Sequence, residues 1–192
     1  AKEHSLENLI DTDNENLKKI GQEYVTKLKN ISDNSKRVTD KLPINFKWIG
    51  LIKLILPNSK IIHCNRNSKD VCLSIFKNYF VSDKLKYAYN LKELTEFYKL
   101  YSNLMKHWEK TLPKFIYNIK YENIIHNPDR EIKRLLKACD LGWDANCLKF
   151  YENKRPIKTA SDTQARNKIY DTSINYWKNY EKQYSLESKK TT

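Results

Sequence analysis

The spacing of apolar side chains predicts that much of this chain is helical. Over residues about 13–31, apolar residues recur at three- and four-residue steps from Leu17 to Leu28, which is typical of a helix with one buried face. The same spacing predicts a long amphipathic helix that Pro113 ends, with apolar positions at Leu91, Leu94, Phe97, Tyr98, Tyr101, Met105 and Trp108.

Shorter helices are expected between capping and turn signals. Asn45 can cap a helix that runs to Leu56, because Pro57 follows as a stop signal. The proline of Asn127-Pro128 favours the start of another helix, which Gly142 closes. Three more helices are expected over about 69–80, 144–152 and 173–183.

Three short segments are candidate β-strands, over residues 37–40, 60–65 and 115–121. Strands separated by helices pair in parallel through right-handed crossovers, so the expected fold class is α/β, a helix-rich parallel sheet flanked by helices. In such sheets, ligands bind beyond the carboxyl ends of the strands. We therefore expect three groups to share one rim of the sheet: Arg66, Tyr121 and the pair Asp40-Lys41.

The connection after the second predicted strand carries a candidate phosphate site. Arg66 follows the apolar run, and Ser74, eight residues later, would lie about two turns into the next helix. A guanidinium fork and a hydroxyl so placed can hold one phosphate between them. An ordinary strand–helix unit with a surface Arg is the alternative at this stage.

Composition fits one folded domain with a substantial core, since 40% of the 192 residues are hydrophobic. The net charge of +13 is compatible with nucleic acid, an acidic glycan, an anionic membrane or a phosphorylated cofactor. Because only six basic residues are Arg while Lys is spread along the chain, the Arg positions carry more weight than the net charge. The expected organisation is a helical segment over 1–36, a main domain over 37–185 and a polar tail over 186–192.

Cysteine and histidine usage gives no metal signal. The four cysteines show no metal-ligand spacing, so we expect no metal site, and Cys64 and Cys72 lie in apolar contexts typical of small buried hydrophobes. Disulfides stay open, although a reducing compartment is favoured. We expect His63 and His126 to be structural. No apolar run is long enough to span a bilayer and no signal peptide is recognised, so we expect a cytoplasmic protein.

Regular spacing breaks down between Tyr151 and Tyr170, where a long basic segment predicts a lid or binding loop. With that loop, four blocks of the sequence stand in a fixed order. They are Thr39-Asp40-Lys41-Leu42-Pro43-Ile44-Asn45-Phe46; Lys60 to Arg66 with Asp70 to Ser74; Tyr121-Glu122-Asn123; and Thr159-Ala160-Ser161 through Gln164 and Arg166 to Ser173 and Trp177. In this order they resemble the sulfotransferases that use 3′-phosphoadenosine 5′-phosphosulfate (PAPS), in the branch of bacterial repeat-linked enzymes related to tyrosylprotein sulfotransferases. The resemblance covers residues about 37–182 and implies their P-loop-kinase-like fold.

The resemblance implies roles for several residues. Arg66 and Ser74 match the pair that binds the 3′-phosphate of PAPS, and Tyr121 matches a tyrosine near the adenosine, unless it is only a core aromatic. Lys41 matches a lysine that stabilises the leaving oxygen of the sulfuryl donor. Asp40 either orients this lysine or caps the next turn.

The later blocks imply further contacts. The basic loop matches the segment that folds over the cofactor, with Arg166 as the main phosphate contact and Lys168 and Thr159 as lesser ones. Ser173 matches a catalytic-site serine near the sulfate end, although an ordinary N-cap is the alternative.

The family's 5′-phosphosulfate loop and a motif-supported catalytic base are missing from this sequence, so we expect an N-terminally incomplete sulfotransferase domain. The implied reaction is transfer of a sulfuryl group from PAPS to the hydroxyl of a glycan, a peptide tyrosine or a small alcohol, without a metal and with no nucleic-acid partner. The alternative is a basic nucleic-acid-binding or scaffold domain without catalysis. A nucleotide kinase is disfavoured because the chain lacks GxxxxGK[ST].

Overall fold

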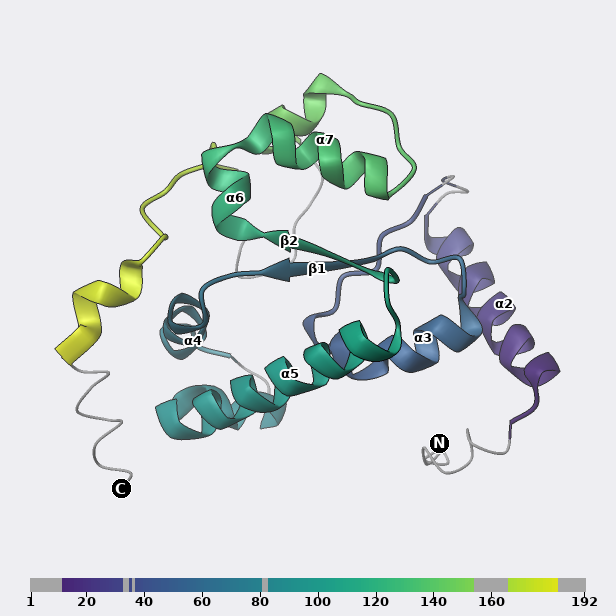
Figure 1. Ribbon diagram of the computed structural model, residues 1–192, viewed down its shortest axis with the longest axis horizontal. Helices are drawn as coiled ribbons and strands as arrows, with labels where there is room; N and C mark the ends of the chain where they lie inside the picture. Colours follow the sequence, from purple (N-terminus) through teal and green to yellow (C-terminus); the bar gives the residue numbers. More distant parts are fainter. Residues whose placement is uncertain (1–11, 33–34, 36, 81–82, 154–165, 183–192) are drawn as a thin grey trace. The chain divides into compact units, whose positions relative to one another are not determined.

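The computed structural model describes residues 12–32, 35, 37–80, 83–153 and 166–182 (Figure 1). The chain divides into two compact units, 1–59 and 60–192. Each unit is described by itself below.

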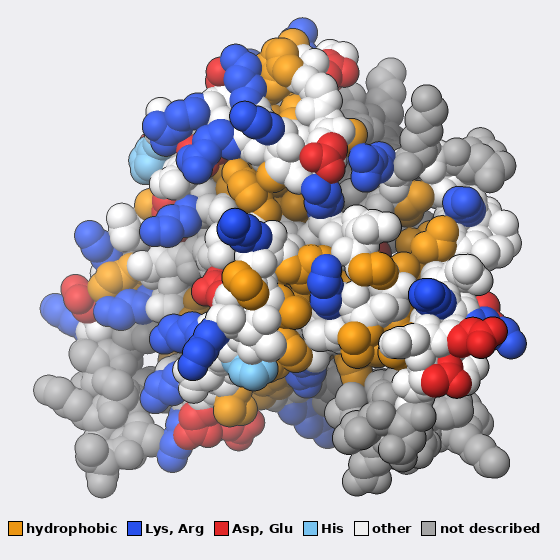
Figure 2. All heavy atoms as spheres, turned by 45° about the vertical axis from the view of Figure 1, so that its right-hand side comes forward, with side chains coloured by type: hydrophobic (Ala, Val, Ile, Leu, Met, Phe, Trp, Pro, Cys, Tyr) orange, Lys and Arg blue, Asp and Glu red, His pale blue; other side chains and the backbone are white. Residues whose placement is uncertain are grey.

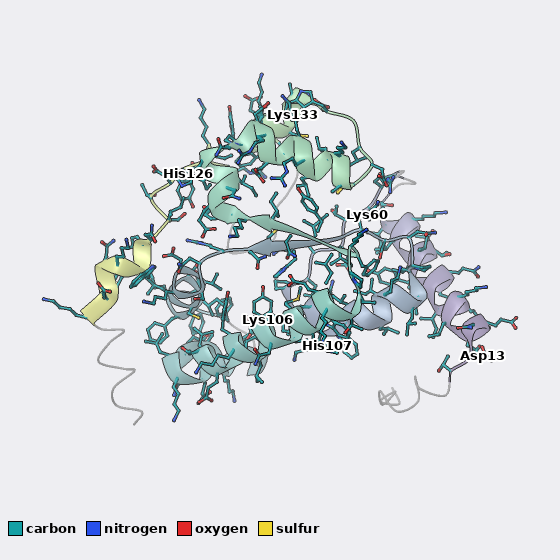
Figure 3. All side chains as sticks on the ribbon, in the orientation of Figure 1. Asp13, Lys60, Lys106, His107, His126 and Lys133 are labelled. Carbon is teal, nitrogen blue, oxygen red and sulfur yellow. The ribbon has the colours of Figure 1, made fainter. Side chains whose placement is uncertain are left out.

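The first unit is built on helix α2 (Asn14–Ile31), followed by the 3₁₀ helix η1 (Pro43–Trp48) and helix α3 (Ile49–Ile55). Asp13 caps α2, because its carboxylate accepts the backbone N–H of Asn16 at 2.8 Å (labelled in Figure 3). Helices α2 and α3 pack against each other at Gly21, where a Cβ atom would collide with the carbonyl oxygen of Ile55. A glycine is required there because the two backbones approach so closely.

One prediction for the first unit is wrong, and one predicted helix is present but starts earlier than expected. Residues 37–40 form no strand, since all four are exposed and have no hydrophobic face to bury. The helix expected from Asn45 begins earlier, at Pro43, as a 3₁₀ turn whose N-cap is Leu42 without a side-chain cap bond. Proline favours the first helical position because its φ is fixed near the helical value and it needs no N–H partner there. The helix predicted over 13–31 is confirmed as α2.

The second unit alternates strands and helices, as the apolar pattern predicts. Its elements in order are β1 (Ile61–Asn65), α4 (Ser68–Phe76), η2 (Asp83–Tyr89), α5 (Leu91–Thr111), β2 (Ile116–Lys120), α6 (Tyr121–His126), α7 (Pro128–Ala138), η3 (Ala145–Glu152) and η4 (Tyr176–Tyr180). The long helix is confirmed as α5. The helix expected to reach residue 80 ends at Phe76, and Tyr121 starts α6 where a strand end was predicted.

Strands β1 and β2 pair in parallel, with Ile61 opposite Ile116 and Asn65 opposite Lys120. The α/β class is therefore confirmed, although the described residues contain a sheet of two strands where three were predicted. Figure 1 shows α7 on one side of this sheet and α5 on the other. The buried apolar side chains of the unit come from α4, η2, α5 and β2; they are Cys72, Leu73, Ala88, Leu94, Met105 and Ile119.

His63 joins β1 to its neighbours through both ring nitrogens. Its Nδ1 lies 2.7 Å from the Asn118 side-chain oxygen on β2, and its Nε2 is hydrogen-bonded to the Tyr101 hydroxyl on α5. Burial raises the pKa of Tyr101 to about 12, so this phenol stays protonated and can donate. These bonds give His63 a structural role between the sheet and α5. His126, at the exposed end of α6, is labelled in Figure 3.

The two cysteines near β1 differ in environment. Cys72 is buried, as predicted, and burial raises the pKa of its thiol to about 11. Cys64 was also predicted to be buried, but it is exposed on β1. In the part of the chain that the structure describes, no helix combines the length and apolar character needed to cross a membrane.

Candidate functional site

The site is organised by the turn that connects β1 to α4. Asn67 caps α4, because its side-chain oxygen accepts the backbone N–H groups of Lys69 at 3.0 Å and Asp70 at 3.3 Å. The N–H of Asn67 itself donates to a carboxylate oxygen of Glu122 on α6 at 2.8 Å. Asn67 thus connects the turn to both α4 and α6, and Arg66 lies in this turn at the carboxyl end of β1.

Arg66 is held between two groups from distant parts of the sequence. Its guanidinium carbon lies 4.8 Å from the centre of the Tyr121 ring, a cation–π contact, and its Nη2 donates to the Ser173 carbonyl oxygen at 2.6 Å. The Tyr121 hydroxyl in turn lies 2.8 Å from the Ser173 hydroxyl. Three residues selected from the sequence for cofactor binding or catalysis therefore meet in one cluster.

The guanidinium of Arg66 keeps unused donors. Its Nε is buried and has no hydrogen-bond partner, and no carboxylate among the described residues forms an ion pair with it. Its neighbours are neutral: a carbonyl and an aromatic ring. A part-buried cation without a counter-charge is unusual, because removing charge from water is costly unless a partner compensates. The geometry therefore fits an anion at this position.

Ser173 belongs to a segment that Asp70 holds in place. Asp70 is 2% exposed and lies in the first turn of α4. Its two carboxylate oxygens accept the backbone N–H groups of Asn175 at 2.8 Å and Trp177 at 2.9 Å. Sequence reasoning placed Asp70 within a motif but gave it no role, because an acidic residue in a first helical turn ordinarily only complements the helix dipole.

Two lysines, one in the first turn of α4 and one at its C-cap, also face this segment. The Lys69 ammonium lies 3.7 Å from the centre of the Trp177 ring, and that of Lys77 lies 4.3 Å from the centre of the Tyr176 ring. The hydrogen bond with Tyr180 and, to a lesser extent, the contact with Lys77 lower the pKa of Tyr176. Elsewhere, Lys and Arg side chains are dispersed among uncharged and apolar ones on the face that Figure 2 shows.

The other predicted site residues are less closely connected. Ser74 lies in the second turn of α4 and is exposed, and its backbone carbonyl accepts the Asn78 side-chain amide at 2.7 Å. Lys168 lies 5.7 Å from the centre of the Tyr151 ring, a contact outside the Arg66 cluster. Arg166 is half-buried. Thr159 lies outside the described residues. Their proposed contacts with the cofactor remain predictions.

Lys41 belongs to the first unit, where it is exposed. Its neighbour Asp40 accepts the Tyr24 hydroxyl at 2.5 Å and the Asn45 side-chain amide at 3.5 Å. The first of these bonds, assisted by burial, raises the pKa of Tyr24 to about 12. Asp40 therefore attaches the Lys41 loop to α2 and does not cap η1, which decides against the capping alternative.

Comparison with known proteins addresses the family and the fold of the chain. A family model described as "Sulfotransferase family" matches residues 3–145. The chain is 35% identical over 178 residues to an uncharacterised protein of Aquifex aeolicus (strain VF5). This alignment covers 92% of this chain and 23% of that protein. The chain thus spans under a quarter of that relative's length.

A solved structure shares the fold. It is the sulfotransferase domain from the curacin biosynthetic pathway, similar with a TM-score of 0.58 and 16% identity over 83% of this chain and 60% of that domain. The likeness shows a kinase-like α/β fold, as predicted from the sequence. Since the family model covers most of the chain, including β1, α4 and Tyr121, the chain belongs to the sulfotransferase family.

Proposed function

We propose that this chain provides the 3′-phosphate-binding part of a sulfotransferase that uses PAPS. The observation that carries the proposal is the environment of Arg66, a cation at the carboxyl end of β1 with a buried, unpartnered Nε and no ion-pair partner among the described residues. A dianionic phosphate matches the fork of donors that a guanidinium presents.

The residues of the cluster have distinct tasks in this proposal. Arg66 binds the 3′-phosphate, and the Tyr121 ring holds the guanidinium plane in position from one side. The Ser173 carbonyl fixes one Nη group, which leaves the other donors for the ligand. Because these partners are neutral, they orient the charge of Arg66 without neutralising it.

When bound, PAPS supplies the sulfuryl group: a bond forms between its sulfur and an acceptor hydroxyl oxygen as the bond to the 5′-phosphate oxygen breaks. The hydroxyl proton passes to a general base, and adenosine 3′,5′-bisphosphate leaves. We propose that Lys41 carries the cation that stabilises charge on the leaving oxygen. Ser173 would hold the sulfate end with its hydroxyl. The acceptor is proposed to be a hydroxyl compound: a glycan, a peptide tyrosine or a small alcohol.

The test is calorimetric titration of the chain with adenosine 3′,5′-bisphosphate. Wild type should bind saturably, and Arg66→Ala should weaken binding by about 10- to 100-fold, since a charge-assisted hydrogen bond contributes about 1.5–3 kcal/mol. Arg66→Lys should recover part of the affinity, because it restores the charge but not the fork. The matched control is Arg130→Ala, which removes an exposed Arg paired with Glu131 on α7 and should bind like wild type.

Two results would contradict the proposal. Equal bisphosphate affinity in wild type and Arg66→Ala would remove Arg66 from the site. Strongly salt-dependent RNA or DNA binding together with indifference to the bisphosphate would favour a nucleic-acid-binding domain instead.

A further inference from the structure

The buried carboxylate of Asp70 is stabilised by hydrogen bonds from backbone N–H groups rather than by a cation. Among the described residues, no Lys or Arg forms an ion pair with it. Both of its oxygens are used, one by the N–H of Asn175 and one by the N–H of Trp177, at 2.8 and 2.9 Å. An acid this buried is stable only if its lone pairs are satisfied, so the two bonds are needed by Asp70 as well as by the segment it holds.

These two bonds cap η4 from outside. The N-cap residue of η4 is Asn175, whose φ of 57° lies in the left-handed region and whose side chain makes no capping bond. A left-handed residue before a helical turn can direct successive backbone N–H groups at one anion. Asp70 occupies that anion position, so the start of η4 depends on a carboxylate from α4.

The same short segment that Asp70 holds also contacts Arg66. Ser173 lies two residues before Asn175. Its carbonyl oxygen accepts a hydrogen bond from Arg66, and its hydroxyl is hydrogen-bonded to the Tyr121 hydroxyl. Asp70, in the first turn of α4, follows Arg66 by four residues. Segment 173–177 is therefore held at two places: Arg66 binds Ser173, and Asp70 binds the backbone at Asn175 and Trp177.

We propose that Asp70 is a positioning residue for the anion site: it holds segment 173–177 so that Ser173 keeps the Arg66 guanidinium oriented before the nucleotide binds. This inference rests on the function proposed above. Its advantage is preorganisation, because the ordering of side chains is completed during folding and does not reduce the affinity for the ligand.

The variant that tests the inference is Asp70→Asn, with Asp129→Asn on α7 as the control for the change of charge. The amide keeps the size of the acid but presents an NH₂ group to one of the two N–H donors. Asp129 is exposed and pairs with Lys133, which Figure 3 labels. Both variants lose one negative charge, and only the first loses the contact with segment 173–177.

The expected result is a fall in affinity for adenosine 3′,5′-bisphosphate of about tenfold for Asp70→Asn, from the loss of a hydrogen bond to a charged group. Adenosine 5′-monophosphate, which lacks the 3′-phosphate, should change by less than about twofold. The direction of the change in affinity is informative, because by Coulomb's law the removal of a negative charge near an anion site would by itself strengthen anion binding. An unchanged or higher bisphosphate affinity, or an equal fall for both nucleotides, would overturn the inference.

A second measurement needs no variant and stays decisive if Asp70→Asn does not fold. Amide hydrogen exchange, followed by NMR on nucleotide-free wild type, should show the N–H groups of Asn175 and Trp177 protected by at least about 100-fold. If they become protected only after the bisphosphate is added, the ligand and not Asp70 orders the segment. If wild type binds no bisphosphate at all while both amides are protected, the proposed function fails and Asp70 is left with a purely structural role.

Discussion

The contact between the Tyr121 and Ser173 hydroxyls, 2.8 Å apart, can be tested by a double-mutant cycle. Tyr121→Phe removes the phenolic oxygen and keeps the ring that contacts Arg66. Ser173→Ala removes the other partner and keeps the backbone carbonyl that accepts from Arg66. The cycle therefore isolates one hydrogen bond and leaves the guanidinium contacts in place.

The magnitude follows from the burial of the pair. Both residues are half-buried, so water can replace a lost partner in part, and a neutral hydrogen bond of this kind contributes about 1 kcal/mol net. Each single variant should lower the free energy of unfolding by about 1 kcal/mol. The double variant should lower it by about the same amount rather than by twice as much, because the second substitution removes a partner that is already lost.

Urea unfolding followed by tryptophan fluorescence measures these differences. With a denaturant dependence of about 2 kcal/mol per molar, each variant should shift the midpoint by about 0.5 M. Tyr79→Phe is the control, since Tyr79 is 84% exposed, and it should leave the midpoint unchanged. Additive single effects, within about 0.3 kcal/mol, would refute the view that the two hydroxyls bind each other.

Two further predictions concern packing and pH. Leu94 on α5 is 1% exposed, so Leu94→Ala should lower the free energy of unfolding by about 3–4 kcal/mol through lost burial and a cavity. The control is Leu100→Ala on the same helix, where the side chain is 68% exposed and the loss should be less than about 0.5 kcal/mol. Similar losses in the two variants would contradict the packing of α5. The hydrogen bond to the Asp40 carboxylate raises the pKa of Tyr24 to about 12, so folding favours the protonated phenol. The stabilisation from this bond is therefore present below pH 10 and is lost between pH 10 and 12. The difference in unfolding free energy between wild type and Tyr24→Phe should therefore shrink across that interval, and a constant difference would show that the bond is not formed.

The helices that sequence reasoning located most closely are those with long apolar periodicity. Helices α2 and α5 bury one face over several turns, so many residues support the same assignment. The wrong strand at 37–40 rests on four residues, too few to define a period. Tyr121 shows the same limit, because a boundary between a strand and a helix is fixed by local backbone geometry that the apolar pattern does not record.

The candidate site was predictable to the extent that it follows from topology. The rule that ligands meet the carboxyl ends of parallel strands brings Arg66 and Tyr121 together, and both lie beyond the ends of β1 and β2. The role of Asp70 was not predictable, because its partners are backbone groups 105 and 107 residues away and carry no side-chain signature. Contacts of that kind are visible only in three dimensions.

The Arg66–Ser173 bond joins residues 107 positions apart, so the proposed anion site can be completed only after the chain has been made as far as Ser173. During synthesis, β1 and α4 leave the ribosome long before Ser173, so the guanidinium is first exposed without the groups that orient it. The match to the family model ends at residue 145, ahead of that segment. A chain shortened to the limits of the family match would therefore keep the whole sheet and lose the Ser173 contact, and it should fold with an Arg66 that is free to rotate and a weakened preference for the 3′-phosphate.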